Sequence, residues 1–273
     1  MLMQNLEKKV QELKNKGLTN EVIKNNLKEY LQLFILEFLY NQKEYQDLIF
    51  TGGSCLRFCY GLNRLSEDLD LDSLKKIDKK ELSKKIKEYF LKKLQYKDLE
   101  ISIKGKGEKI YLKFPILKSL KLSKLGESDK LYVKIEIEKV FKTPFKLEKT
   151  PILQDGFSFF VKHYDLPSLM AGKINAILFR IFFKGKEDKI TFKGRDWYDL
   201  IWYFKKGIKQ NSAYLKKLTK ISDEKEIFKR LDKKAMKLNL NYLKSDIENL
   251  FENKKFVEDF VSNFRDLYKK LRP

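Results

Sequence analysis

The sequence predicts an α+β protein in which a mixed β-sheet flanked by helices is followed by an all-helical C-terminal portion. Apolar and polar residues alternate with a period of two in several segments between positions 48 and 161, which is typical of half-buried strands. Helical spacing of apolar residues dominates before and after this region. Pro144, Pro151 and Gly156 predict a loop near the change of pattern. We therefore expect one domain over residues 1–165 and a helical domain over residues 166–273.

Helices are expected at the N-terminus, over residues 4–42. Leu6, Val10 and Leu13 recur at helical spacing, and a denser apolar pattern follows. Thr19 is a plausible start of the second helix, because its hydroxyl can accept a bond from a first-turn amide. The segments beyond are predicted as a strand at 48–50, a helix at 54–60, a strand at 69–71 and a helix at 78–95.

A hairpin and two further strands complete the predicted sheet. Residues 99–103 and 109–114 alternate on either side of Gly105 and Gly107, which are suitable turn residues. Strands are also predicted at 130–138 and 157–161. Pro167 suits the first turn of a helix, where its missing N–H costs no hydrogen bond. Helices are expected near 167–183, 196–206, 212–219, 224–235, 241–251 and 255–270.

Length and composition limit the class of protein. The chain has 273 residues, 42% of them hydrophobic, which is enough for a globular core. No apolar run reaches 18 residues, so a membrane-spanning helix is not expected. Charges close to the first Met argue against a signal peptide, and we expect a cytoplasmic protein. Cys55 and Cys59 cannot build a disulfide framework or a four-ligand zinc site and are interpreted as packing residues, while the lone His163 cannot anchor a histidine metal cluster.

The formal net charge of +21 has two interpretations. A strongly basic surface is typical of proteins that bind RNA or DNA. The alternative is a lysine-biased composition, because lysine far outnumbers arginine and is scattered through every segment. Charge and motifs together favour a nucleic-acid partner.

The most informative segment spans residues 50–72. Gly52-Gly53-Ser54 follows an apolar strand and predicts a bend whose backbone amides can approach a phosphate. The alternating residues Asp68, Asp70 and Asp72 share one face of the next strand. Neighbouring carboxylates repel one another unless a cation lies between them, and such oxygen ligands suit Mg²⁺. The segment therefore predicts a site for a nucleoside triphosphate (NTP) and a metal ion.

Three further groups can join this site. Glu136 and Glu138 alternate on one strand, so either can bring a third carboxylate. Lys173 lies among small and apolar residues, where a bound phosphate would account for its charge. Asp196 and Asp199 lie three residues apart near one helix face. Simpler interpretations stay open. Asp68 and Asp70 could form a solvated strand end, and Lys173 could be a surface lysine that extends its ammonium group to water. Asp196 and Asp199 could be carboxylates favoured by the dipole at a helix start.

These motifs occur in the order found in a known family. The chain resembles the AbiEii nucleotidyltransferase toxin family between about residues 47 and 203, in Gly-Gly-Ser-x-Leu-Arg, Arg-x-Ser-Glu-Asp-Leu-Asp-Leu, Lys-Ile-Glu-Ile, Ala-Gly-Lys and Gly-Arg-Asp-Trp-Tyr-Asp-Leu. The resemblance implies the fold of the DNA polymerase β-like nucleotidyltransferases. It also implies a prokaryotic toxin, often paired with an AbiEi-type antitoxin. Related MenT-type toxins modify the acceptor end of tRNA, which implies an RNA acceptor with tRNA favoured.

The resemblance also assigns roles to individual residues. The matching positions are the triphosphate-holding bend of Gly53 and Ser54, the metal-binding carboxylates Asp68, Asp70 and Glu136, and the later positions Lys173 and Asp196. Two Mg²⁺ ions would bridge the carboxylates to the NTP, with Glu136 as a metal ligand or as the base that accepts the hydroxyl proton. Arg57 and Arg195 are predicted to assist Lys173 at the phosphates, and Asp196 to orient Lys173 or the nucleotide.

The predicted reaction is the transfer of a nucleotide from an NTP to RNA. A hydroxyl attacks the α-phosphorus in line and pyrophosphate leaves, so the protein mainly positions groups and neutralises charge. One alternative is transfer to a protein or a small molecule. The other is a non-catalytic module that holds nucleic acid or an antitoxin.

Overall fold

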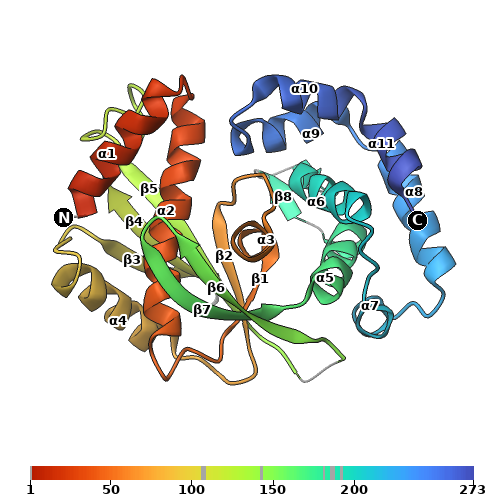
Figure 1. The fold of residues 1–273 in the computed structure, drawn as a ribbon, viewed down its shortest axis with the longest axis horizontal. Helices are drawn as coiled ribbons and strands as arrows, with labels where there is room; N and C mark the ends of the chain where they lie inside the picture. The colour runs from red at the N-terminus through yellow and green to blue at the C-terminus, as the bar shows by residue number, and fades with distance from the viewer. Residues whose placement is uncertain (1, 106–108, 142–143, 181, 185–187, 191–192) are drawn as a thin grey trace. The chain divides into compact units, whose positions relative to one another are not determined.

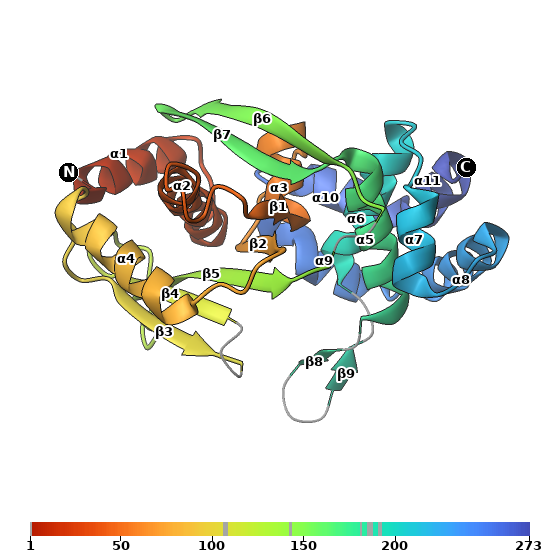
Figure 2. The same ribbon diagram turned by 90° about the horizontal axis from the view of Figure 1, so that it is seen from below.

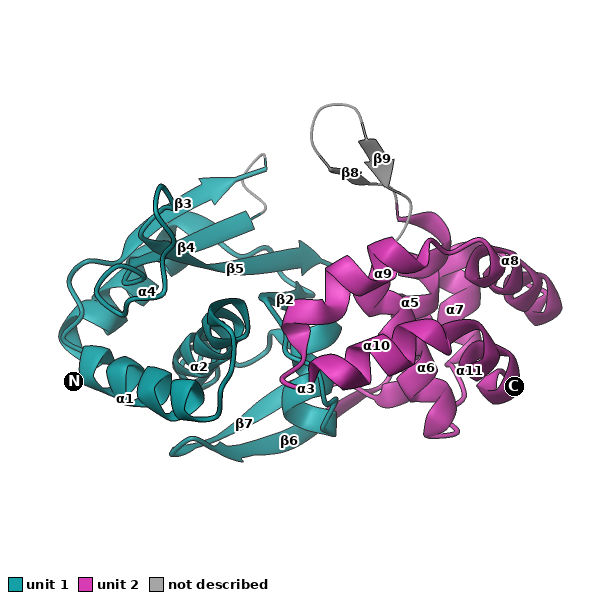
Figure 3. Cartoon of the chain, turned by 90° about the horizontal axis from the view of Figure 1, so that it is seen from above, with its two compact units in different colours: residues 1–141, 149–163 teal, residues 142–148, 164–273 magenta. Residues whose placement is uncertain are grey.

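The computed structural model describes residues 2–105, 109–141, 144–180, 182–184, 188–190 and 193–273. The chain forms two compact units, which Figure 3 colours separately. Unit 1 comprises residues 1–141 and 149–163, and unit 2 comprises residues 142–148 and 164–273. Buried apolar side chains give each unit its own core.

Unit 1 is built on a seven-stranded mixed sheet with the strand order β3-β4-β5-β2-β1-β7-β6. The strands are β1 (Ile49–Thr51), β2 (Asp68–Ser73), β3 (Glu100–Lys104), β4 (Lys109–Pro115), β5 (Lys130–Lys139), β6 (Leu147–Gln154) and β7 (Phe157–Tyr164). The helices are α1 (Leu2–Asn15), α2 (Asn20–Tyr40), α3 (Gly52–Tyr60) and α4 (Lys79–Lys92). The sheet curves around α2, as Figures 1 and 2 show.

Strand β2 lies in the middle of this sheet, antiparallel to β1 and parallel to β5. Its alternate residues Leu69 and Leu71 are buried, so its aspartates point to the opposite face. Strand β5 alternates in the same way, with Ile135 and Ile137 buried. The polar side chains of these two neighbouring strands therefore lie on one face of the sheet.

Helix α2 supplies the centre of the unit 1 core. The Phe34 ring centroid lies 4.7 Å from that of Phe157 on β7 and 6.5 Å from that of Phe90 on α4. Phe90 lies in turn 5.4 Å from Phe114 on β4. Edge-to-face and tilted ring pairs of this kind add to the stabilisation from apolar burial. One helix thus connects distant strands of the sheet and fixes its curvature.

The alternation of residues predicts this sheet well except at β6. The sequence predicts a loop around Pro151, and this prediction is wrong: the segment is the edge strand of the sheet. An edge strand tolerates proline because one side of its backbone has no ladder partner. Most side chains of β6 are exposed, so the segment lacks the apolar alternation that identifies a strand.

Unit 2 is mainly helical. Its helices are α5 (Leu166–Phe179), α6 (Gly194–Lys205), α7 (Ser212–Thr219), α8 (Glu224–Met236), α9 (Leu240–Ile247), α10 (Lys254–Ser262) and α11 (Phe264–Leu271), with a 3₁₀ turn at Glu248–Leu250 and a pair of short strands, β8 (Phe182–Lys184) and β9 (Asp188–Ile190). Pro167 lies in the first turn of α5 as expected, and the Asp165 carboxylate accepts a bond from the Ser168 amide. In the described part of the chain, no helix is long and apolar enough to cross a membrane.

Two helix predictions in unit 2 need correction. The helix expected to reach residue 183 ends at Phe179. The single helix expected over 255–270 is divided at Asn263, whose φ of −96° and ψ of 6° interrupt the helical path. The Asn263 side chain donates to the Asp259 carbonyl at 2.8 Å and so competes with the helical backbone bonds.

Candidate active site

Three carboxylates lie together on the polar face of the central strands. Asp70 of β2 is directly opposite Glu136 of β5 in the register of the parallel pair. Asp68 shares this face of β2 and is opposite Lys134. All three carboxylates are half-buried. The fold therefore brings the metal-binding positions predicted from the sequence side by side.

The ammonium group of Lys134 bridges two of these carboxylates. Its Nζ lies 2.9 Å from Asp68 Oδ2 and 2.5 Å from Glu136 Oε1, and Lys109 Nζ lies 3.3 Å from the same glutamate oxygen. Burial alone would raise the pKa of Glu136, but the two lysines outweigh it and hold that pKa below its ordinary value. Burial alone would lower the pKa of Lys134, but Asp68 and Glu136 raise it instead. The charges of Lys134 and Glu136 thus stabilise each other.

The donor set fits a divalent cation. Asp68, Asp70 and Glu136 offer carboxylate oxygens on adjacent strands, and an ammonium group held by two of them shows that the cluster attracts positive charge. Hard cations such as Mg²⁺ take oxygen ligands of this kind and keep waters or phosphates as further ligands. These three residues would hold the metal.

The glycine bend lies against the same cluster. Helix α3 begins at Gly52, two residues before the predicted start, and Gly52 has a left-handed φ of +74°. A Cβ atom at Gly52 would overlap the Asp70 carboxylate, so the bend contacts that side chain through its backbone. Thr51, the N-cap residue, makes no side-chain bond to the first-turn amides. A helix start without a side-chain cap is suited to binding an anion.

We expect Gly52→Ala to impair both the fold and the carboxylate cluster. The substitution places a side chain in a left-handed conformation and against Asp70, at a cost of about 1–3 kcal/mol in the free energy of unfolding. Gly61→Ala is the matched control, because Gly61 has φ of +71° but no atom within 4 Å of its Cβ position. Urea unfolding and nucleotide transfer would be measured on both variants. Equal losses of transfer would contradict a role for the contact with Asp70.

Two predicted phosphate contacts, Ser54 and Arg57, are engaged within the fold. Ser54 is fully buried, and its hydroxyl donates to the Asp68 carbonyl and lies 2.9 Å from the Ser66 hydroxyl. Arg57 Nε lies 3.3 Å from Glu29 Oε2. Burial raises the pKa of Glu29, and Arg57 only partly opposes this. Ser54 therefore connects the bend to β2, and Arg57 connects α3 to α2.

Arg64 lies against the bend, a position that the sequence does not predict. It is only 2% exposed, and its Nη1 donates to the Leu65 carbonyl at 2.9 Å. A Cβ atom at Gly53 would lie 2.5 Å from its Nη2, so Gly53 leaves room for the guanidinium group. Nothing in the local sequence indicates that this arginine is buried.

In unit 2, Lys173 of α5 lies between two aspartates of α6. Its Nζ is 2.7 Å from Asp196 Oδ1 and 2.8 Å from Asp199 Oδ2. Arg180 Nη1 lies 2.6 Å from the second Asp196 oxygen. Burial alone would raise the pKa of Asp196, but Lys173 and Arg180 outweigh it and lower that pKa to about 2. The fold thus brings together the Ala-Gly-Lys and Gly-Arg-Asp motifs and adds Arg180. The sequence does not identify Arg180 as a site residue, because it belongs to neither motif.

Arg195, the arginine of the Gly-Arg-Asp motif, belongs to the first turn of α6. Its backbone N–H donates to Asp246 Oδ2 at 3.1 Å, which fixes the start of that helix against α9. Gly194 assists, since its Cβ position would lie 3.0 Å from the Leu243 carbonyl oxygen. The motif therefore has a packing role as well as any role in binding.

The two cysteines and the single histidine also converge in unit 1. The ligand atoms of Cys55, Cys59 and His163 lie within 4.8 Å of one another, a grouping that the sequence does not predict. His163 is fully buried, with Nε2 2.8 Å from the Thr150 hydroxyl and Nδ1 3.2 Å from the Tyr60 hydroxyl. These partners satisfy the buried imidazole, in keeping with a packing role.

The curved mixed sheet, with carboxylates on adjacent strands beside a glycine bend, defines a nucleotidyltransferase-type fold. Two solved structures share it at low sequence identity. JHP933 from Helicobacter pylori is 20% identical with a TM-score of 0.50, and the alignment covers 90% of this chain and 91% of that one. MenT4, the nucleotidyltransferase toxin Rv2826c from Mycobacterium tuberculosis H37Rv, is 15% identical with a TM-score of 0.52, covering 99% and 89%.

The family model described as nucleotidyl transferase AbiEii toxin, type IV TA system, matches residues 35–268, and the chain belongs to this family. No curated protein matches the chain in sequence. The family predicted from the motifs is thereby confirmed, and the protein is a nucleotidyltransferase of a toxin–antitoxin family. Nucleotidyltransferases of this kind act on an NTP with a divalent metal, and the family description points to an antitoxin as partner.

Proposed function

We propose that this protein transfers a nucleoside monophosphate from an NTP to an RNA acceptor, with tRNA favoured, in a Mg²⁺-dependent reaction. In this proposal it acts in the cytoplasm as the toxin of a toxin–antitoxin pair, with an AbiEi-type protein as antitoxin. The observation that carries the chemistry is the contact of the Gly52 bend with Asp70, which is itself paired in register with Glu136.

The bend and the carboxylates have complementary charges. The amides at the start of α3, which the Thr51 side chain does not cap, carry partial positive charge and can hold triphosphate oxygens. Asp68, Asp70 and Glu136 would hold the metal, which would supply positive charge to the phosphates during the transfer. Either Glu136 completes the metal site or it accepts the proton of the attacking hydroxyl.

Lys173 and Arg195 are assigned to the β- and γ-phosphates, with Asp196 orienting Lys173. The 2.7 Å contact between Lys173 Nζ and Asp196 Oδ1 supports the orienting role. Ser54 and Arg57 act mainly by holding α3 in place, because their polar atoms already contact Asp68, Ser66 and Glu29. Their effect on NTP use would therefore be indirect.

Incubation with each α-labelled NTP, Mg²⁺ and total cellular RNA tests this function. We expect label on RNA of tRNA size and no label after chelation of the metal. The net charge of +21 favours a polyanionic acceptor over a small molecule. Label found on a protein or a small molecule would support that alternative instead. Absence of any labelled product with every NTP and metal would support a non-catalytic binding module and contradict the proposal.

A further inference from the structure

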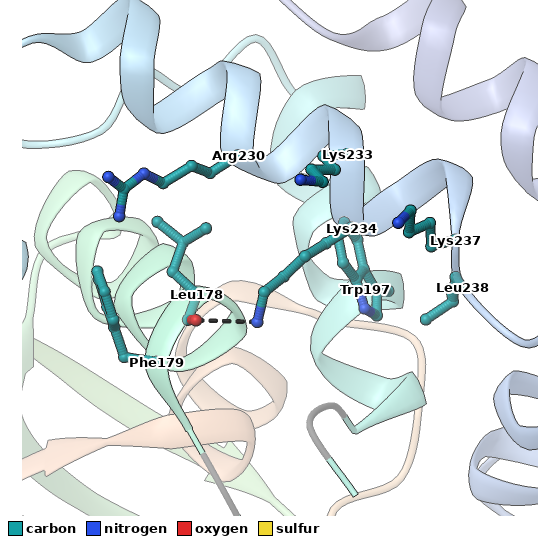
Figure 4. Close-up of a pocket in the computed structure, with 8 residues that line it drawn as sticks. All are labelled: Leu178, Phe179, Trp197, Arg230, Lys233, Lys234, Lys237 and Leu238. Atoms are coloured by element: carbon teal, nitrogen blue, oxygen red, sulfur yellow. Dashed lines mark hydrogen bonds between the residues drawn. The ribbon is translucent and has the colours of Figure 1, made fainter.

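Unit 2 contains a basic pocket that the proposed chemistry does not use. The pocket has a volume of about 420 Å³, within the usual range for ligand sites. Figure 4 shows its walls, which are formed by the end of α5, by α6 and by α8 with the residues that follow it. The lining residues are Leu178, Phe179, Trp197, Arg230, Lys233, Lys234, Lys237 and Leu238.

Four cations form a stripe along one side of this pocket. Arg230, Lys233, Lys234 and Lys237 are spaced i, i+3, i+4 and i+7, so they share a face of α8 and its C-cap. Arg230 Nε pairs with Glu226 Oε1 at 2.7 Å. Lys233 and Lys237 are exposed, and no carboxylate of the described residues lies within ion-pair distance of either. Among the described residues, these two lysines therefore present positive charge that no carboxylate pairs with.

Lys234 has a structural task at the bottom of the stripe. Its Nζ donates to the Ile177 carbonyl at 3.0 Å and to the Leu178 carbonyl at 2.8 Å, as drawn in part in Figure 4. These carbonyls lie in the last turn of α5, where a cation is favoured by the helix dipole. Lys234 thus fixes α8 on α5 and is not a free ligand group.

The opposite wall of the pocket is apolar and aromatic. Phe179 is 44% exposed, which is unusual for phenylalanine at the end of a packed helix. The buried Trp197 also lines the pocket. A ligand suited to this pocket has an aromatic face and negatively charged groups.

We propose that this pocket binds a single-stranded segment of the RNA acceptor, with a base against Phe179 and successive phosphates along Lys233, Lys237 and Arg230. Aromatic rings beside a track of cations are the usual features of single-strand binding surfaces. The stripe extends about 10 Å along the helix axis, which suits more than one phosphate rather than a single anion. This inference rests on the proposed function, because it names a surface for the acceptor.

The test compares two double variants on the same helix. Lys233→Glu with Lys237→Glu changes the pocket, and Lys225→Glu with Lys229→Glu makes the same change at exposed lysines of α8, also four residues apart, that do not line it. The binding of a fluorescent single-stranded RNA is measured by anisotropy over a range of salt concentrations. NTP binding is measured separately on each variant. A Lys233→Gln with Lys237→Gln variant replaces the first if charge reversal lowers Tm.

We expect the pocket variant to bind RNA about tenfold or more weakly. The slope of the logarithm of the binding constant against the logarithm of the salt concentration should become less steep by about 1.4, since each lost phosphate contact removes about 0.7. The control should lose much less, and NTP binding should be unchanged in both. Equal losses in the two double variants, or no loss in the pocket variant, would overturn the inference even where RNA is labelled. If RNA binding depends on the pocket but no nucleotide is transferred, the proposed function is contradicted. The assignment of the pocket as an RNA-binding site would still hold.

Discussion

Asp70→Asn is expected to abolish nucleotide transfer, with kcat falling about a thousandfold or more. The substitution keeps the size of the side chain and removes the charge that lies opposite Glu136 and against the Gly52 bend. The proposed metal site would then have two carboxylate residues, Asp68 and Glu136, instead of three. Transfer of label from NTP to RNA measures the effect, and an unchanged Tm would show that the fold is intact.

Asp72→Asn provides the matched control for this experiment. Asp72 lies two residues further along β2, on the same face, and is opposite Glu138 instead of Glu136. It carries the same charge change outside the proposed ligand set, so we expect most of the activity to remain. If both variants lose activity equally, general loss of negative charge on β2 explains the result, and the assignment of Asp70 is wrong.

Lys173→Met is expected to cause the largest loss of stability, about 3–5 kcal/mol in the free energy of unfolding. The ammonium group neutralises Asp196 and Asp199, whose side chains are 5% and 0% exposed. Removing it leaves two aspartates of α6 in a buried place with too little positive charge. Urea unfolding of the variant measures this loss.

Two comparisons separate this effect from a general effect of losing a lysine. Lys244→Met breaks the exposed pair with Glu258 in the same unit and should cost less than about 1 kcal/mol. Adding Asp199→Asn to Lys173→Met removes one uncompensated charge and should recover part of the lost stability. No recovery in the double variant would contradict the explanation by buried charge.

The same network predicts a specific dependence on pH. A carboxyl group with a lower pKa in the folded chain stabilises the fold above its unfolded pKa, and this stabilisation is lost as the pH falls through the folded pKa. For Asp196 the ordinary value is 3.8 and the folded value is about 2, so the loss falls between about pH 4 and pH 2. Asp196→Asn should flatten this part of the curve of unfolding free energy against pH. An unchanged slope would show that other groups control acid unfolding.

Local patterns in the sequence were sufficient to predict most helices and strands of the fold. The hairpin of β3 and β4 pairs Glu100 with Lys113 through Lys104 with Lys109, as the alternation around the two glycines predicts. Strands β2 and β5 were equally clear because one face of each is buried. Strand β6 and the break at Asn263 were not, since both depend on tertiary neighbours that override a weak or misleading local pattern.

The candidate site was predictable in its residue types but not in its contacts. The aspartates of β2 and the bend were evident because their chemistry is encoded within one short segment. The positions of Lys134 between Asp68 and Glu136, and of Arg180 beside Asp196, depend on strand register and on where α5 ends. So many lysines are scattered through the sequence that nothing singles out Lys134, and Arg180 lies outside the recognised motifs.

The continuity of β1, α3 and β2 has a consequence for the order in which the molecule assembles. Thr51 pairs with Asp70 across neighbouring antiparallel strands, so the bend and its aspartate meet by closing the short stretch of chain that contains α3. Short closures have a small entropic cost and form early, whereas Glu136 must arrive from a strand much further along the chain. A nascent chain is therefore expected to complete its phosphate-facing half first and to acquire metal-binding competence only when the later strand docks.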